Sequence, residues 1–530
     1  MTRRWGPLGA AVASVVILLS GCVTIPLSGD VHTEKIDVDP EVPSVILPPR
    51  PVAGQTPVEI VQGFLNAGRG PQNRYEIARE FLAPTAEWAP TSRVLVTSSA
   101  INPVAVDADT VSVTVTVVGE VDATGRYTQV PSQVQTLSYD IAEVDGENRI
   151  AQADPGTVLT RNGFTTAFGP YPLYFYDQSF EFLVPDLRWF PITREVADRI
   201  VDELLVGPAP WLSSGVLFNA FPQGTSGRAE YVAPEVNVVL SDEVRAESAL
   251  TQRRMLEQLD ASFRSLGNVN EIFVTAAGID LAPAADDTEP VSVYTVRDGA
   301  VGGFEGQFGA LTPTGIDPLT GIRSRADELE PVAAALARDR ASVAVLGPGG
   351  VTLVTPSGSL PIDTRAGLVA PSLDPHGFTW SVPRSDASGL IVVSAEGEQY
   401  QLPLALEGHV VALEVARDGA RVLVALSTAN GSRLAVIGIQ RDADLVPVAF
   451  GAVYDLDAGD PLIDVAWVDG THVAVLSMGD DASEVEVLAL GGPSVDLGEI
   501  EGAIAIVGGN STAGIRVRLC RTRASRNPAT

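Results

Sequence analysis

Cys22 is the residue whose surroundings point most clearly to a chemical reaction. It ends the tetrad Leu19-Ser20-Gly21-Cys22, in which a leucine and two small residues precede a cysteine. This is the bacterial lipobox pattern: the thiol receives a diacylglycerol, the preceding peptide is cleaved, and the new amino group is acylated. The pattern therefore predicts S-diacylglycerol and N-palmitoyl groups on Cys22. The alternative is an ordinary signal peptide with an incidental cysteine.

The segment before Cys22 fits a cleaved signal. Arg3 and Arg4 form a short basic start, and residues 8–19 are apolar or small without a charge. A secretory signal has an apolar core of about 7–15 residues, whereas a membrane-spanning helix needs about 20. We therefore predict a lipoprotein signal peptide at residues 1–21 and a mature chain at the extracytoplasmic face of the cell membrane. Two or more acyl chains exceed the single chain that gives only reversible binding.

Other residue types that perform chemistry are not arranged for it in the sequence. No two of the four histidines (His32, His376, His409 and His472) lie within eight residues of each other, so metal-ligand spacing is not found. The Gly347-Pro348-Gly349-Gly350 turn lacks the Lys-Ser/Thr of a phosphate-binding loop. A glycosidase pair among the 66 acidic residues cannot be assigned from sequence. We predict no enzyme, no cofactor and no metal site.

Charge and cysteine content exclude several partner classes and one kind of crosslink. The formal net charge is −31, and cleavage of Arg3 and Arg4 makes it −33. Such a surface repels nucleic acid and anionic headgroups, so we expect no nucleic-acid partner and membrane contact only through the lipid. The chain has two cysteines. If Cys22 is acylated, Cys520 has no intramolecular partner, and the fold is not held by disulfides.

Composition and periodicity predict a multidomain chain with two α+β or α/β domains followed by an all-β, propeller-like domain. Residues 22–55 are rich in proline and lack a helical period, which indicates an extended tether. We place an N-terminal α+β domain at 56–190, a second domain at 191–290 and the propeller-like domain at 291–530.

The first two domains show recognisable element patterns. In the first, Thr56-Pro57-Val58-Glu59 predicts a capping box that starts a helix, a second short helix is expected at 75–82, and residues 111–117 alternate as a half-buried strand. The second domain reads as a helix from Thr193 to Gly207, a strand at 236–240, a helix from Ser241 and a strand at 272–275. That order predicts a small α/β sandwich.

A loose phrase repeats after about residue 325. Turns containing Asp339, Asp418 and Asp469, with a weaker copy at Asp374, each precede an apolar strand, and successive aspartates are 35, 44 and 51 residues apart. A spacing of about 40–50 residues per four-stranded unit is typical of propeller blades. The alternative is a β-sandwich with Asp-Gly hairpins.

Aromatic residues crowd the end of the first domain. They are Tyr171, Tyr174, Phe175, Tyr176, Phe180, Phe182, Trp189 and Phe190. A strand-rich core or a seam between domains explains the cluster, and a ligand platform is the alternative.

Three passages resemble the LpqB lipoprotein family of actinobacteria. They are the start Cys22-Val23-Thr24-Ile25-Pro26-Leu27-Ser28-Gly29, the stretch from Glu203 to Gly278, and the propeller-like end. Within the second passage, Leu204–Pro208, Ala220–Thr225 and Asn237–Ser241 are similar to the GerMN module. No site residue except Cys22 transfers from these motifs.

The resemblance implies an accessory role in a two-component system. Members of the family are thought to contact the extracellular part of the sensor histidine kinase MtrB and to influence phosphorylation of the regulator MtrA, with effects on cell-envelope homeostasis and division. Two other functions stay open: an extracellular ligand-binding protein or hydrolase that uses the propeller mouth, and a structural lipoprotein that binds the cell wall. Converging buried carboxylates in the channel would favour the hydrolase.

Overall fold

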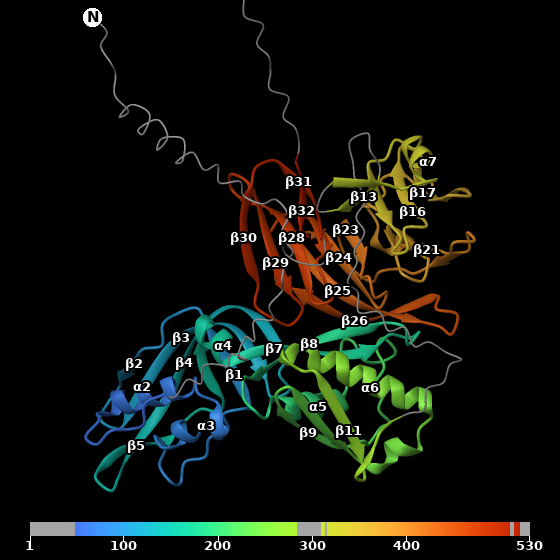
Figure 1. Cartoon of the computed structure of the whole chain (residues 1–530). Helices are drawn as coiled ribbons and strands as arrows, with labels where there is room; N and C mark the ends of the chain where they lie inside the picture. Colours follow the sequence, from blue (N-terminus) through green and yellow to red (C-terminus); the bar gives the residue numbers. More distant parts are fainter. Residues whose placement is uncertain (1–47, 283–308, 313–314, 509–513, 520–530) are drawn as a thin grey trace, which may run out of the picture. The chain divides into compact units, whose positions relative to one another are not determined.

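The computed structural model describes residues 48–282, 309–312, 315–508 and 514–519 (Figure 1). Cys22, the signal segment, most of the tether and Cys520 lie outside these residues. The described part contains two mixed α and β regions followed by strands arranged in successive small sheets. The predicted fold class is confirmed.

The first helix begins where the sequence predicts. In α2 (Pro57–Ala67), the Thr56 hydroxyl accepts from the Glu59 N–H, and the Glu59 carboxylate accepts from the Thr56 N–H at 2.8 Å. These reciprocal bonds satisfy two N–H groups that a helix start leaves unpaired, and they lower the pKa of Glu59. In the second helical segment, α3 (Gln72–Arg79), the three residues Asn73, Arg74 and Tyr75 have positive φ, so its right-handed turns follow the predicted start at Tyr75.

The first sheet has the order β5-β4-β3-β1-β6, with β2 paired to β3. Every second residue of β3 from Val111 to Val117 is a valine whose side chain is buried. These valines lie on one face of the sheet and pack against α2 and α3. A short helix, α4 (Arg161–Ala167), follows the last strand. The strands are β1 (Arg93–Thr97), β2 (Pro103–Ala105), β3 (Thr110–Asp122), β4 (Tyr127–Val144), β5 (Glu147–Gln152) and β6 (Thr157–Thr160).

The second region combines a hairpin, two main helices and a four-stranded sheet of order β12-β11-β10-β9. Its parallel pair, β10 with β11, is connected through α6, as the predicted strand–helix–strand order requires. The elements are β7 (Phe168–Tyr176), β8 (Leu183–Pro191), α5 (Val196–Val206), β9 (Gly227–Val232), β10 (Glu235–Leu240), η1 (Asp242–Ala246), α6 (Ala249–Phe263), η2 (Arg264–Leu266), β11 (Glu271–Ala276) and β12 (Ile279–Asp280).

One predicted helix start in this region is wrong. Ser241 precedes only the 3₁₀ turn η1, and its side chain does not cap that turn. The long helix α6 starts at Ala249, where the Ser248 hydroxyl accepts from the Thr251 N–H at 3.1 Å. Ser241 and Ser248 are both possible N-cap residues and lie close together in the chain. Only Ser248 precedes a long segment with an apolar helix face.

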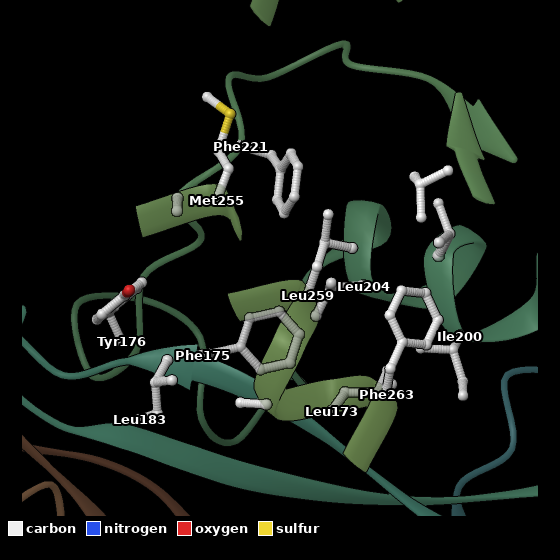
Figure 2. Packing of buried hydrophobic residues seen from close by; sticks show 14 of the residues in the cluster. Leu173, Phe175, Tyr176, Leu183, Ile200, Leu204, Phe221, Met255, Leu259 and Phe263 are labelled. Carbon is white, nitrogen blue, oxygen red and sulfur yellow. The ribbon is translucent and has the colours of Figure 1, made fainter. Parts of the chain in front are cut away.

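Most buried residues of the β7–β8 hairpin pack into the second core, while Phe168 and Trp189 lie in a buried cluster with first-region residues such as Val96 and Phe164. Leu173 and Phe175 of β7 lie in one buried cluster with Leu259 and Phe263 of α6 (Figure 2). The sequence pattern places the end of the first domain at residue 190, whereas this hairpin shares its core with the helices that follow. Within the second region, α5 and α6 lie on one side of the sheet that contains β9 and β11 (Figure 1).

The C-terminal region contains four successive four-stranded antiparallel sheets, each made of strands consecutive in sequence. This arrangement is that of propeller blades, and the first strands of successive sheets contact one another. The sheets are β15 (Ala333–Leu336), β16 (Val343–Gly347), β17 (Gly350–Thr355) and β18 (Gly358–Asp363); β19 (Ser372–Leu373), β20 (Thr379–Ser381), β21 (Ile391–Val393) and β22 (Gln399–Gln401); β23 (His409–Val415), β24 (Arg421–Thr428), β25 (Gly431–Arg441) and β26 (Pro447–Leu456); β27 (Leu462–Trp467), β28 (His472–Met478), β29 (Ser483–Ala489) and β30 (Val495–Ile500).

Shorter elements flank these sheets. Two strand pairs are β13 (Gly309–Thr312) with β14 (Gly315–Pro318), and β31 (Ala503–Val507) with β32 (Arg516–Leu519). The helical turns are α7 (Arg323–Asp327) and η3 (Ala387–Gly389). The first strands of the sheets, β15, β19, β23 and β27, contact one another in a row, and we call them the inner strands. The first strand of the last pair, β31, contacts β27 and so continues this row.

Candidate functional site

The predicted acylation site, Cys22, lies outside the described residues, so its lipids stay a prediction. Within residues 48–282, 309–312, 315–508 and 514–519, no helix is both long and apolar enough to cross a bilayer.

The repeated aspartates form the turns between the first and second strands of the four sheets. Each carboxylate accepts a hydrogen bond from the backbone N–H two residues later, at 2.7–3.0 Å; the pairs are Asp339 with Ala341, Asp374 with His376, Asp418 with Ala420 and Asp469 with Thr471. This bond stabilises a tight turn without a ligand. The sequence located these residues correctly, and their role is structural.

The three described histidines lie in separate places in the repeats. His376 belongs to the turn between β19 and β20, His409 begins β23, and His472 begins β28. The His472 ring Nδ1 lies 3.0 Å from the turn carboxylate of Asp469. No group of three His, Cys, Asp or Glu side chains suited to hold a metal occurs in the described part of the chain.

A set of polar side chains on the inner strands was not found from the sequence. Ser372, Glu414 and Asp464 each accept, at 2.9 Å, a backbone N–H from the next inner strand: those of Val415, Trp467 and Ile506 respectively. We call these three residues the inter-blade acceptors. They precede the turn aspartate of the same sheet by two, four and five residues respectively. Because this spacing varies, no sequence motif predicts them.

The two acidic inter-blade acceptors have raised pKa values. Burial raises the pKa of Glu414 from 4.5 to about 7, against the opposing effects of the Trp467 N–H and the nearby Arg417. Burial likewise raises the pKa of Asp464 from 3.8 to about 6, although the N–H groups of Ile506 and Val465 favour its charged form. Each carboxylate thus joins two blades and holds a proton more tightly than it would in the unfolded chain.

These raised pKa values predict that the propeller loses stability as pH rises from about 5 to about 8. A carboxyl group with a raised folded pKa stabilises the fold below its unfolded pKa, and this contribution disappears as pH passes the folded value. Each pH unit by which the folded pKa exceeds the unfolded one corresponds to about 1.4 kcal/mol of stability. Glu414→Gln keeps an oxygen acceptor for Trp467 and cannot ionise, so we expect the fall in melting temperature from pH 5 to pH 8 to be smaller than in the wild type.

Calorimetry of the wild type and of Glu414→Gln from about pH 5 to about pH 8 gives the slope of melting temperature against pH for each protein. Comparison of these two slopes checks the prediction. His376 has a lowered pKa, chiefly through burial and also through Arg441, and it acts in the opposite direction because the fold loses that contribution as pH falls. Both proteins contain His376, so its effect cancels in the comparison. Equal slopes for wild type and Glu414→Gln would contradict the assignment.

The aromatic residues at the end of the first domain are divided among the second core, a seam with the propeller, and a buried cluster of first-region residues that contains Trp189. Tyr171, Phe175 and Phe190 are core residues. Phe182, in the turn of the hairpin, meets the His376 ring edge-on at 5.8 Å between centroids, and the guanidinium of Arg338 lies over Phe182 at 5.4 Å. The core-and-seam interpretation is confirmed for these residues.

The hairpin contacts the first turns of three of the four described four-stranded sheets. Besides Arg338 and His376, Ala420 belongs to the hairpin's buried cluster, and a Cβ at Gly470 would lie 2.8 Å from Pro185 of β8. Because these turns all connect first to second strands, they lie at one end of the inner strands. The β7–β8 hairpin therefore covers that end of the propeller.

Two further contacts extend this seam. The Trp189 indole donates to the carbonyl of Gly491 at 2.9 Å, and the rings of Trp211 and Tyr454 stack at 5.0 Å between centroids. Burial raises the pKa of Tyr454 to about 12. The described residues belong to one compact unit of the chain, and these aromatic contacts join its second region to the propeller.

A buried ion pair supports the hairpin from within. Arg188 of β8 donates to Asp186 at 2.6 Å, and its side chain has no exposed surface. The same Asp186 carboxylate accepts the Ala209 N–H at 2.7 Å, and Arg188 also reaches the carbonyl of Thr124 at 3.1 Å. This group links the first region, the hairpin and the loop after α5.

The chain matches two family models, in the order that the resemblance implies. Residues 50–165 match "Lipoprotein LpqB, N-terminal domain", and residues 306–515 match "Lipoprotein LpqB beta-propeller domain". The chain is also similar to proteins named Lipoprotein LpqB. One from Cutibacterium acnes is 24% identical, over 93% of this chain and 90% of that protein, and one from Streptomyces coelicolor is 27% identical, over 89% and 86%.

Solved structures overlap with smaller parts of the chain. Virginiamycin B lyase from Staphylococcus aureus is 11% identical, over 38% of this chain and 68% of that one, with a TM-score of 0.27. Hydrazine synthase from Kuenenia stuttgartiensis is 14% identical, over 34% and 51%, with a TM-score of 0.26. The two family models are both LpqB domains, the relatives named Lipoprotein LpqB align over most of this chain, and this chain belongs to the LpqB lipoprotein family.

Proposed function

We propose that this chain is a lipid-anchored accessory protein, held at the extracytoplasmic face of the cell membrane through Cys22, that binds and modulates a sensor histidine kinase of the MtrB type. Through the kinase it would influence phosphorylation of an MtrA-type regulator, cell-envelope homeostasis and division. Family membership supports the lipid anchor, and the kinase partner is the function that the family resemblance implies.

The observation that carries a contact role, rather than turnover, is that the acidic inter-blade acceptors are used to join neighbouring sheets. Glu414 and Asp464 each already accept a backbone N–H from the neighbouring blade at 2.9 Å. The hairpin lies against turns of the same sheets, with Pro185 beside Gly470 and Phe182 beside His376. Polar groups that join the blades, together with a hairpin packed against their turns, support a rigid body that presents its outer surfaces to a partner.

Confinement to the membrane would allow weak contacts to suffice. A tethered protein reaches a membrane-embedded partner at a much higher effective concentration than a free one. Crosslinking in native membranes, followed by identification of the captured proteins, tests the proposal. We expect the kinase among the products. Recovery of wall fragments or extracellular peptides without the kinase would contradict it.

A hydrolase is the second candidate, and a specific observation favours it. A carboxyl group with a pKa of about 7 has the value expected of a general acid near neutral pH, and Glu414 has it on the strand beside that of Asp464. The two explanations differ in outcome. If Glu414 is catalytic, Glu414→Gln abolishes hydrolysis of a cell-wall glycan or peptide substrate while kinase crosslinking is not seen. If it only joins blades, crosslinking persists in the variant.

A further inference from the structure

The sheet of the second region has one face that no described element covers. Helices α5 and α6 pack on the inner face, where Val236, Val238 and Val274 are buried. The side chains that alternate with them point outward and are exposed. An antiparallel or mixed sheet with one solvated face normally presents polar residues there.

Two neighbouring apolar side chains, Phe273 and Val239, lie on this outer face beside the polar Asn237 and Thr275, and we call them its apolar centre. Phe273 of β11 is 45% exposed and Val239 of β10 is 41% exposed. In the register of the parallel pair, Val239 lies opposite Thr275, so Phe273 is its diagonal neighbour on the same face. At the far corner, Val232 of β9 is 61% exposed. Exposed aromatic and aliphatic side chains grouped on a flat sheet are typical of interaction sites, and single exposed residues are not.

Carboxylates surround this centre. The strand registers place Glu230, Glu235, Glu271 and Asp280 on the same face, and Arg228 is the basic residue among them. None of the four carboxylates forms an ion pair within the described residues. We call Phe273, Val239, Val232 and these four acids the outer sheet face.

Charge decides between possible occupants. A second copy of the chain would bring four like charges against four. The segment that leaves β12 carries Asp286, Asp287 and Glu289 in its first residues, so it too is like-charged. A partner with lysines and arginines around exposed apolar side chains matches the face in both respects, because complementary charge favours association and burial of an aromatic anchor supplies affinity.

We propose that the outer sheet face is the docking surface for a protein partner whose own surface is basic around an apolar centre. The inference rests on the proposed function, and the partner is then the extracytoplasmic domain of the sensor kinase. The lipid holds the chain at the membrane, and this face makes the specific contact.

The test measures binding of the purified kinase domain to the full chain and four variants. Phe273→Ser and Glu271→Arg alter the face. Leu497→Ser and Glu499→Arg are matched controls on β30, where Leu497 is also 45% exposed. We expect the first two to weaken binding by about tenfold or more and the controls by less than about twofold. Raising NaCl from about 0.05 M to about 0.5 M should weaken wild-type binding as well.

The outcomes separate the inference from the function on which it rests. If the kinase domain binds the wild type and all four variants equally, the face is not the docking surface, although the proposed function stands. If the kinase domain does not bind the wild type, both are wrong. A wild-type dimer in sedimentation that Phe273→Ser dissociates, with kinase binding unaffected, would assign the face to a second copy and overturn the proposal. Equal melting temperatures for the variants show that each is folded.

Discussion

Cys22→Ala is expected to move the protein from the membrane fraction to the medium or the soluble extracytoplasmic fraction. The described part of the chain contains no helix suited to span a bilayer, and the net charge of −31 opposes peripheral binding to anionic lipid. Two or three acyl chains bind a bilayer stably, so their removal takes away the attachment itself. Fractionation followed by immunoblotting measures the result.

The matched control is Cys520→Ala, which removes the only other cysteine. That variant should stay with the membrane like the wild type. Membrane retention of Cys22→Ala after a high-salt wash would contradict the predicted anchor, and equal release of both variants would point to a loss of folding.

Asp374→Ala is expected to destabilise the propeller far more than the same change in an exposed turn. The Asp374 side chain is buried and accepts from Arg441 at 2.8 Å, from the Trp380 indole at 3.0 Å, and from the N–H groups of His376 and Phe378. Alanine leaves the buried Arg441 guanidinium without its carboxylate. Breaking a buried pair in this way costs about 3–5 kcal/mol.

Asp339→Ala is the control, because Asp339 occupies the same turn in another sheet but is exposed and accepts the Ala341 N–H. We expect its effect on the free energy of unfolding to be about 1 kcal/mol. Denaturant unfolding of both variants gives the comparison. Similar losses for the two would mean that the ion pair with Arg441 contributes little beyond the turn bond.

The turns and the first helix start were the parts of the fold that the sequence predicted well. The spacing of Asp339, Asp374, Asp418 and Asp469 located the first turn of each four-stranded sheet, because a side chain that bonds its own backbone acts locally. The capping box at Thr56 is local in the same sense. The helix predicted to start at Ser241 was wrong because residues that favour a helix N-cap also precede short turns that do not continue into a helix.

The sequence did not predict features that depend on contacts between residues far apart in the chain. Glu414 is one acidic residue among 66 until the fold brings the Trp467 N–H to it. The β7–β8 hairpin follows the strands of the first domain in sequence, and only the fold shows that Leu173 and Phe175 share a buried cluster with α6. The sequence predicted a strand at 272–275, but not which of its side chains the helices would leave exposed.

The measurement that tests the central claim most directly is phosphorylation of the kinase in reconstituted vesicles with and without the acylated chain. A membrane-anchored modulator should change the rate of kinase autophosphorylation, and the unanchored Cys22→Ala protein at the same total concentration should have a much smaller effect. An autophosphorylation rate that is the same in the presence and absence of the acylated wild-type chain would contradict the account.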